Sequence, residues 1–243
     1  MSHLFLFDID LTLIRSPGVG SGAMNQVMHE LLGVTDAFAG VDFGGRTDRA
    51  IIRDALRNHG RAPEDGAFEA FIAEFESRYI PVLEAMLAER GGWILPGVQD
   101  TLKAVSSLSE VRVGVATGNF RRAAFAKLRY LQLDSYFQDG GFADDAEDRG
   151  ELVRVAIERL GGAAGGDYGV FVIGDTSHDI TAAQVNGAIA IGVATGSSSP
   201  EMLAAAGAAH VFTDLSQPDN MLRALLGEGA TAEAPSPGPS PTS

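Results

Sequence analysis

The chain has no cysteine and only two lysines, and each shortage limits its chemistry. Without a thiol in its 243 residues, it can form no disulfide, no thiolate nucleophile and no sulfur-ligated metal site. Lysine occurs only at Lys103 and Lys127, so arginine carries almost all of the positive charge. Long apolar runs are missing too, and no segment approaches the ~18 apolar residues that cross a membrane. We therefore expect no membrane association.

The balance of charge is strongly negative. The formal net charge is −14, and such a surface repels the phosphate backbone of nucleic acid. Nucleic acid is therefore not an expected partner. The N-terminal residues lack the basic stretch and long apolar region of a signal peptide, and we expect a cytoplasmic protein. With 45% hydrophobic residues, the chain can bury a sizeable core.

Short apolar runs alternate with amphipathic segments along most of the chain. The expected strands are residues 4–7, 111–116, 169–173, 188–193 and 210–213. The expected helices are residues 98–108, 121–131, 150–160, 180–186, 200–206 and 220–226. Strands separated by helices are typical of βαβ units and a parallel sheet. The predicted fold class is therefore α/β, with a parallel sheet covered by helices on both faces.

A second pattern occupies residues 17–94, where apolar side chains recur at helical spacing. Three helices are expected there, and Pro81 is expected to kink the third or to start a new one. We predict an α/β core of residues 1–16 and 95–227, a small all-helical cap of residues 17–94, and a tail of residues 228–243. The tail is rich in Pro, Ser and Ala, and this composition predicts disorder.

Polar residues follow three of the expected strands at the point where each strand ends. They are Asp8, Asp10 and Thr12; Thr117, Gly118 and Asn119; and Asp175, Thr176 and Asp179. The carboxyl ends of parallel strands meet at one edge of a sheet, so these groups are expected to lie together. Carboxylates this close repel one another, and a hard divalent cation such as Mg²⁺ would neutralise them. The sequence therefore predicts a Mg²⁺ site with Asp8 and Asp175 as its best side-chain ligands.

The same residues indicate phosphoryl transfer. With its charge offset by the metal, Asp8 could attack a phosphorus atom and form an aspartyl-phosphate. Asp10 would protonate the leaving alkoxide and later deprotonate the attacking water. Thr117 and the backbone amides after it would hold the phosphoryl oxygens. Two carboxylates on one loop are thus explained by two roles, nucleophile and general acid–base.

Three segments resemble motifs of the haloacid dehalogenase superfamily. They are "DIDLT" (8–12), "VATGN" (115–119) and "GDTSHD" (174–179), similar to the first, second and fourth motifs, and the resemblance covers roughly residues 4 to 226. It implies a Rossmann-like core, a helical cap and phosphatase chemistry, with phosphoglycolate-phosphatase-like and β-phosphoglucomutase-like members as the most similar branch. It also implies that Asp10 offers its backbone carbonyl to the metal and that Asp179 acts directly or through water.

The resemblance extends to residues that would bind substrate. Arg46 lies in "GRTDRAII" (45–52), a segment similar to the one that carries a substrate-reading arginine in related caps. A solvated arginine near Asp48 is the alternative for Arg46. Thr12, Gly118 and Asn119 belong to the matched motifs, and we expect them in substrate binding as well.

The third motif departs from the family pattern. The family usually has a lysine between its second and fourth motifs, whereas Lys127 falls in the helix directly after Thr117. We therefore predict that Arg149 takes the place of this lysine, with Arg154 as second choice, because a guanidinium can clamp a phosphate with two hydrogen bonds. The alternative is that Arg149 is a surface arginine paired with nearby acids, namely Asp144, Asp145 or Asp148.

The leading hypothesis is a Mg²⁺-dependent phosphatase that acts on a small phosphorylated metabolite, because a small lid closes over a compact molecule. A sugar phosphomutase of the β-phosphoglucomutase type would share every core residue and is the alternative. A dehalogenase would not need Asp10, and a phosphonoacetaldehyde hydrolase would need a cap lysine that this chain lacks. A non-catalytic binding module is a third hypothesis, which the presence of both Asp8 and Asp10 disfavours.

Overall fold

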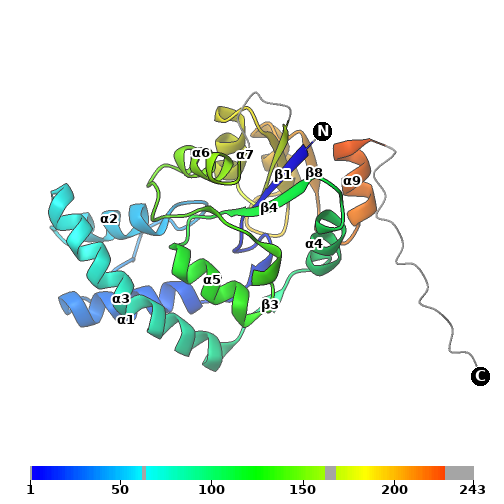
Figure 1. The fold of residues 1–243 in the computed structure, drawn as a ribbon. Helices are drawn as coiled ribbons and strands as arrows, with labels where there is room; N and C mark the ends of the chain where they lie inside the picture. The colour runs from blue at the N-terminus through cyan, green and yellow to red at the C-terminus, as the bar shows by residue number, and fades with distance from the viewer. Residues whose placement is uncertain (1, 62–63, 162–167, 228–243) are drawn as a thin grey trace, which may run out of the picture.

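The computed structural model describes residues 2–61, 64–161 and 168–227, and it is built around a parallel sheet (Figure 1). Its six strands run in the order β5-β4-β1-β6-β7-β8. They are β1 (Ser2–Phe7), β4 (Val111–Ala116), β5 (Gly140–Gly141), β6 (Tyr168–Gly174), β7 (Ile189–Val193) and β8 (His210–Phe212). The chain begins in the middle of the sheet, where β1 pairs in parallel with β4 on one side and β6 on the other. The α/β class is confirmed, and β5 is a short strand that the sequence pattern did not predict.

Helices cover both faces of this sheet. On one face lie α4 (Val98–Ser106), α5 (Arg121–Tyr130) and α9 (Pro218–Leu226); on the other lie α6 (Arg149–Arg159), α7 (Ser177–Val185) and α8 (Pro200–Ala205). A short 3₁₀ helix, η1 (Asp134–Tyr136), follows α5. Successive side chains of β1 point to opposite faces, so Phe5 and Phe7 pack with the first group and Leu4 and Leu6 with the second. β1 is therefore apolar on both faces, as a central parallel strand must be.

Three further helices, called the cap below, pack together beside α5 (Figure 1). They are α1 (Val19–Leu32), α2 (Asp48–Asn58) and α3 (Asp65–Arg90). Their apolar side chains form a second core, which also includes Phe120, Ala123 and Ala126 at the start of α5 and within it. Because Ala124 and Leu128 of the same helix pack on the sheet, α5 joins the two cores. An antiparallel ribbon of β2 (Ile14–Arg15) and β3 (Trp93–Ile94) lies beside the predicted limits of the cap.

α3 continues as one helix through Pro81, where a kink or a new helix was expected. Proline in a helix interior removes a hydrogen bond and costs roughly 3 kcal/mol. On both sides of Pro81, however, Tyr79, Ile80 and Leu83 are buried in the core of the cap. Packing of this face outweighs the local loss, and the expectation of a new helix at Pro81 is wrong.

Two helices begin earlier than predicted because polar side chains cap them. The Asp148 carboxylate accepts a hydrogen bond from the backbone N–H of Glu151 at 3.0 Å, and α6 begins at Arg149 rather than at residue 150. Thr176 and Asp179 form a capping box, and α7 begins at Ser177 rather than at residue 180. These starts place Arg149 and Asp179 at the carboxyl edge of the sheet.

Two further sequence predictions concern the C-terminal tail and membrane association. The predicted tail, residues 228–243, lies outside the described residues. Within the described ranges, none of the helices combines the length and the apolar character that a membrane crossing requires.

Candidate active site

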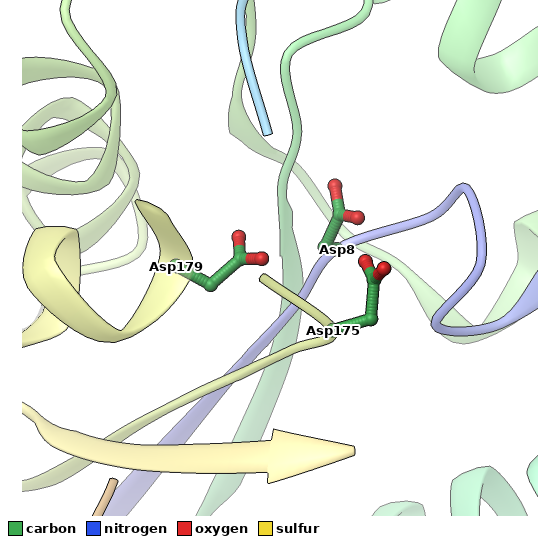
Figure 2. Close-up of side chains that lie close together, drawn as sticks. All are labelled: Asp8, Asp175 and Asp179. Carbon is green, nitrogen blue, oxygen red and sulfur yellow. The ribbon is translucent and has the colours of Figure 1, made fainter. Parts of the chain in front are cut away.

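Asp8, Asp175 and Asp179 converge at the carboxyl ends of β1 and β6 (Figure 2). Asp8 follows β1 directly, and its backbone N–H donates to the Ile173 carbonyl at 2.9 Å, which holds the end of β1 against β6. Asp175 follows β6, and Asp179 lies in the first turn of α7. One carboxylate oxygen from each lies within 4.8 Å of the other two, and all three residues are buried. The structure thus brings together three of the four carboxylates that the sequence placed at this edge.

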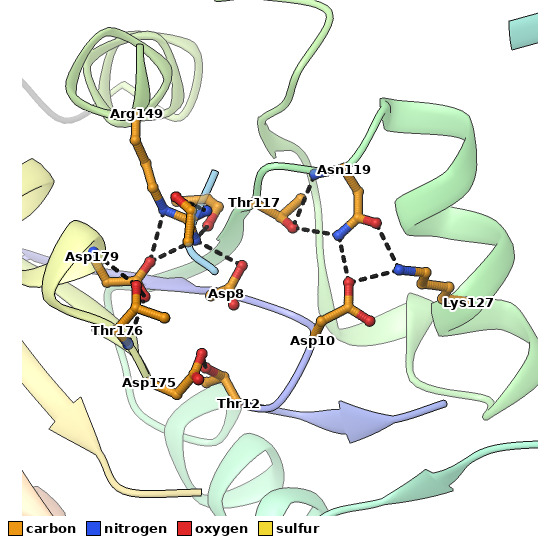
Figure 3. A network of polar contacts seen from close by, with 12 residues as sticks. Asp8, Asp10, Thr12, Thr117, Asn119, Lys127, Arg149, Asp175, Thr176 and Asp179 are labelled. Carbon is orange, nitrogen blue, oxygen red and sulfur yellow. Dashed lines mark hydrogen bonds and ion pairs between the residues drawn. The ribbon is translucent and has the colours of Figure 1, made fainter. Parts of the chain in front are cut away.

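Arg149 lies among these carboxylates rather than on the surface (Figure 3). Its Nη2 is 2.8 Å from Asp8 Oδ1 and 2.5 Å from Asp179 Oδ1, and its Nε donates to Asp179 Oδ1 at 2.8 Å. Burial lowers the pKa of Arg149, but the charges of Asp179 and Asp8 outweigh burial and raise it above its usual value. The alternative of a surface arginine is therefore wrong. The second choice, Arg154, is exposed and pairs with Glu151 and Glu158.

Asp179 is held from two sides. Its Oδ2 accepts hydrogen bonds from the Thr176 backbone N–H at 3.1 Å and from Thr176 Oγ1 at 2.7 Å, while its Oδ1 faces Arg149. Gly174 makes room for this carboxylate, because a Cβ at that position would lie 2.2 Å from Asp179 Cγ. Asp179 therefore fixes Arg149, and Arg149 in turn fixes Asp8.

The carboxylate cluster is short of positive charge. Three carboxylates and one guanidinium leave two negative charges uncompensated when all are ionised. Burial, opposed by Arg149 and reinforced by the charges of Asp179 and Asp10, raises the pKa of Asp8 to about 7. Burial and the charges of Asp8 and Asp179 raise the pKa of Asp175 to about 8. Oxygen donors with excess negative charge fit a hard divalent cation such as Mg²⁺.

Asp10 lies apart from this cluster although it is only two residues from Asp8 (Figure 3). The loop turns at Leu11, which adopts a left-handed conformation (φ 63°) that is uncommon for a bulky residue. The Leu11 backbone N–H donates to the Ile14 carbonyl at 2.8 Å, and Thr195 Oγ1 donates to the Leu11 carbonyl at 2.5 Å. These bonds support the turn that directly follows Asp10.

A lysine that the sequence analysis left without a role binds Asp10. Lys127 Nζ, on α5, donates to Asp10 Oδ2 at 2.6 Å and to Asn119 Oδ1 at 2.7 Å, and Lys127 is only 4% exposed. Asn119 Nδ2 also donates to Asp10 Oδ2, at 2.8 Å. The signal was present in the sequence, because Lys127 stands four residues after Ala123 and directly before Leu128, on the buried side of its helix.

Thr117, Gly118 and Asn119 form the loop after β4, as predicted, and all three border the cavity described below. Thr117 Oγ1 accepts a hydrogen bond from Asn119 Nδ2 at 2.8 Å. Glycine is needed at position 118 because the cap lies against it: a Cβ there would be 2.1 Å from the carbonyl oxygen of Arg46. The loop therefore contacts both the Asp10 carboxylate and the cap.

The cap is attached at this loop by Asp48, another residue without a predicted role. The Asp48 backbone N–H donates to the Gly118 carbonyl at 2.6 Å, and Asp48 Oδ2 accepts from the Phe120 backbone N–H at 2.9 Å. Burial raises the pKa of Asp48 to about 7, although Lys127 and the Phe120 N–H oppose the rise. Asp48 is thus a buried contact between the cap and the loop after β4.

Two predicted substrate-binding residues have other partners. Arg46 borders the cavity, and its guanidinium is paired with Asp54, with Nη2 2.6 Å from Asp54 Oδ2. Thr12 is buried and donates from Oγ1 to Asp175 Oδ1 at 3.4 Å. It is not among the residues that line the cavity within the described ranges. Its contact indicates support of Asp175 rather than contact with substrate.

The cavity lies between the sheet edge and the cap, with a volume of about 540 Å³. The core contributes Asp8, Asp10, Asn119, Lys127 and other side chains, and the cap contributes residues of α1, α2 and α3. The cavity therefore has the carboxylate cluster on one side and the cap on the other.

The family of the chain follows from comparison with known proteins. A family model described as haloacid dehalogenase-like hydrolase matches residues 5–184. The chain therefore belongs to the haloacid dehalogenase-like hydrolases, and the resemblance carried by the three motifs is confirmed.

Similar proteins come from several bacteria. The chain is 27% identical over 238 residues to "Probable phosphatase IndB" of Dickeya dadantii (strain 3937), covering 93% of this chain and 96% of that protein. It is 28% identical over 143 residues to a phosphoglycolate phosphatase of Rhodobacter capsulatus, covering 57% and 60%. A crystal structure of β-phosphoglucomutase from Clostridium difficile shares the fold, with a TM-score of 0.66 and 18% identity over 89% of this chain and 93% of that one.

Proposed function

We propose that this protein is a Mg²⁺-dependent phosphatase that hydrolyses a small phosphomonoester through an aspartyl-phosphate. The observation that carries the proposal is that two carboxylates of one loop lie in different environments. Asp8 is buried in the carboxylate cluster, whereas Asp10 borders the cavity outside it and is bound by Lys127 and Asn119. Such a pair suits a nucleophile and a separate general acid–base. The hydrolase family and the two relatives named as phosphatases support the same class of reaction.

Asp8 would act as the nucleophile. Its Oδ1 is oriented by Arg149 at 2.8 Å, and the residue borders the cavity. A carboxylate oxygen of Asp8 would form a bond to phosphorus while the bond from phosphorus to the ester oxygen breaks. Water would then attack the phosphorus of the aspartyl-phosphate, which releases inorganic phosphate and restores Asp8.

Asp10 would act as the general acid in the first step and as the general base in the second. Its side chain is 39% exposed, so it can reach a leaving alkoxide in the cavity and, afterwards, a water molecule. In the first step Asp10 gives its proton to the ester oxygen. In the second step it takes a proton from the attacking water. Lys127 and Asn119 would hold the carboxyl group in place during both steps.

The metal would be held by Asp8 and Asp175, with the backbone carbonyl of Asp10. Both oxygens of Asp179 already accept hydrogen bonds, so Asp179 would contact the metal through a water molecule. Asp179 would also keep Arg149 in position. Bound Mg²⁺ supplies the positive charge that allows an ionised carboxylate to approach an anionic phosphate.

Thr117 and Arg149 would hold the phosphoryl oxygens, together with the backbone N–H groups of Gly118 and Asn119. Thr117, Gly118 and Asn119 line the cavity in one continuous loop, and Arg149 supplies a permanent positive charge. Their preorganised donors would stabilise charge on the transferring phosphoryl group.

The substrate would be compact, because the cap lies over the site and the cavity is about 540 Å³. Phosphoglycolate, a sugar phosphate and a nucleoside monophosphate all meet this condition. A sugar phosphomutase would use the same residues but return the phosphoryl group to a second hydroxyl of the sugar. The cytoplasmic location remains a prediction from sequence.

One experiment tests the covalent step and, by following phosphate release, separates the phosphatase from the mutase. Protein mixed with substrate and Mg²⁺ is quenched in acid, and the peptide that contains Asp8 is examined by mass spectrometry. The proposal predicts the added mass of one phosphoryl group, its absence in Asp8→Asn, and release of one phosphate for each ester consumed. Conversion of a sugar 1-phosphate into its 6-phosphate without phosphate release would identify a mutase instead.

A further inference from the structure

Tyr79 is a buried residue of the cap whose hydroxyl group has no part in the reaction described above. Its ring packs against Phe75 and Phe120, with ring centroids 5.6 and 6.4 Å away, and the residue is 1% exposed. It nevertheless borders the cavity. No hydrogen bond to its hydroxyl is found among residues 2–61, 64–161 and 168–227. A phenylalanine would fill the same space, so the hydroxyl group, which is open to the cavity, requires its own explanation.

The hydroxyl lies beside two other features of the cavity, Gly20 of α1 and Lys127 of α5. A Cβ added to Gly20 would lie 3.7 Å from Tyr79 Oη and 3.8 Å from Lys127 Nζ. Both polar atoms therefore face the same small space, which the missing side chain of Gly20 leaves open. Three different helices contribute to it, two from the cap and one from the core.

Both polar atoms in this space are hydrogen-bond donors. Burial, and then the charges of Asp48 and Asp10, raise the pKa of Tyr79 well above 10, so the hydroxyl keeps its proton. An ammonium group has three N–H donors, and Lys127 uses two of them on Asp10 and Asn119. The third N–H and the Tyr79 hydroxyl are available to a ligand. A group that satisfied both would have to be a hydrogen-bond acceptor.

We propose that Tyr79, Lys127 and the open space at Gly20 form a subsite that binds an acceptor oxygen on the alcohol portion of the substrate. This inference rests on the proposed phosphatase function, because Lys127 also holds Asp10, the group that would protonate the ester oxygen. The bound oxygen therefore lies close to the ester linkage. A carboxylate oxygen, as in phosphoglycolate, and a hydroxyl oxygen, as in glycerol phosphate, present the same chemistry to the subsite. An unsubstituted alkyl phosphate has no acceptor oxygen on its alcohol portion, so it offers the subsite nothing to bind.

Binding of three esters to the full-length Asp8→Asn protein tests the subsite without turnover. Dissociation constants for phosphoglycolate, glycerol 1-phosphate and ethyl phosphate are measured by calorimetry with Mg²⁺, with and without the additional change Tyr79→Phe. Loss of the hydroxyl is expected to weaken one or both oxygen-bearing esters by about fivefold and ethyl phosphate by less than about twofold. Whether phosphoglycolate or glycerol 1-phosphate is weakened identifies the oxygen that the subsite takes.

The control is Tyr130→Phe, which changes an exposed tyrosine of α5 and is expected to leave all three constants unchanged. Equal weakening of the three esters by Tyr79→Phe, no weakening of either oxygen-bearing ester, or no binding of any ester would overturn the subsite. Turnover of the same esters by the protein with Asp8 intact reports separately on the proposed function. Turnover with unchanged ester preference in Tyr79→Phe would therefore refute the subsite alone.

Discussion

Lys127 Nζ lies 2.6 Å from Asp10 Oδ2, across 117 residues of sequence. The lysine comes from the helix that joins the sheet to the cap, and the aspartate from the loop that follows the central strand. In the same loop, Asp8 is bound instead by Arg149. Each of the two carboxylates thus has a cation of its own, and this separation is the structural basis for assigning them different roles.

Replacing Lys127 by methionine tests its hold on Asp10. We expect kcat for an alkyl phosphate to fall by about 10- to 100-fold, because a poor leaving group needs a positioned general acid. With p-nitrophenyl phosphate, whose leaving group needs little protonation, the fall should be several-fold smaller. The other lysine of the chain supplies the control, since Lys103 is exposed and Lys103→Met should leave both rates unchanged. Equal losses with both esters would contradict the positioning role.

Removing the guanidinium of Arg149 should damage both binding and stability. Arg149→Ala leaves Asp8 and Asp179 buried without their cation, so KM should rise, kcat should fall, and the metal-free protein should lose about 3 kcal/mol of unfolding free energy. Arg149→Lys restores the charge and should recover part of each loss. Arg154→Ala, on the exposed face of the same helix, should change little. Steady-state kinetics and urea unfolding give the comparison, and an Arg154 effect larger than that of Arg149 would reverse the assignment.

Metal affinity should depend on pH. Burial raises the pKa of Asp8 to about 7 and that of Asp175 to about 8, so protons compete with the metal below these values. Calorimetric titration with Mg²⁺ should therefore give tighter binding at about pH 8 than at about pH 5.5. The dependence should be weaker in Asp175→Asn, which lacks one of the titrating groups. Affinity that stays constant over this range would mean that these carboxylates do not bind the ion.

Asp48 should make stability depend on pH in the opposite way from an ordinary ion-paired carboxylate. Its pKa is about 7 in the folded protein and near 4 in an unfolded chain. The folded state therefore binds the proton more tightly, and stability falls as pH rises from about 4 to about 7. Asp48→Asn removes this cost, so its stability relative to the unsubstituted protein should increase between about pH 5 and about pH 8 in thermal unfolding.

A matched control for that measurement lies on the same helix. Arg46 lowers the pKa of Asp54, so Asp54 stays ionised above about pH 5 in the folded and unfolded states alike. Asp54→Asn should therefore differ from the unsubstituted protein by a constant amount across that range. If Asp48→Asn also gave a constant difference, the burial of an ionised Asp48 would not be what limits stability.

The sequence predicted the parts of the molecule that depend on local pattern. The alternation of apolar runs and amphipathic segments was enough to predict the parallel sheet. The positions of the strand ends were enough to predict that Asp8 and Asp175 lie at the same edge of that sheet. Arg149 was predicted from the family resemblance, because the usual third-motif lysine is missing from this chain and an arginine can take its place. A new helix at Pro81, one of the two alternatives, does not occur because α3 is buried on both sides of this residue, which is a tertiary effect.

The sequence did not predict the roles of residues that lie where the cap packs against the core. Lys127, Asp48 and Tyr79 follow no strand end, and each becomes informative only when α5 and the cap helices are packed together. Lys127 lies in the helix directly after Thr117, away from the third-motif position, and the family pattern therefore predicts no role for it. A buried lysine in an apolar helix face is itself a sign of a partner, since an unpaired buried ammonium is costly.

The most direct test of the central claim is phosphate release from a panel of small phosphomonoesters, measured with Mg²⁺, with EDTA and with Asp8→Asn. The account predicts release from at least one ester that requires the metal, with loss of more than about 1,000-fold in Asp8→Asn. The variant should remain folded by circular dichroism, since the substitution removes a buried negative charge. Release that persists in EDTA or in folded Asp8→Asn would contradict the account.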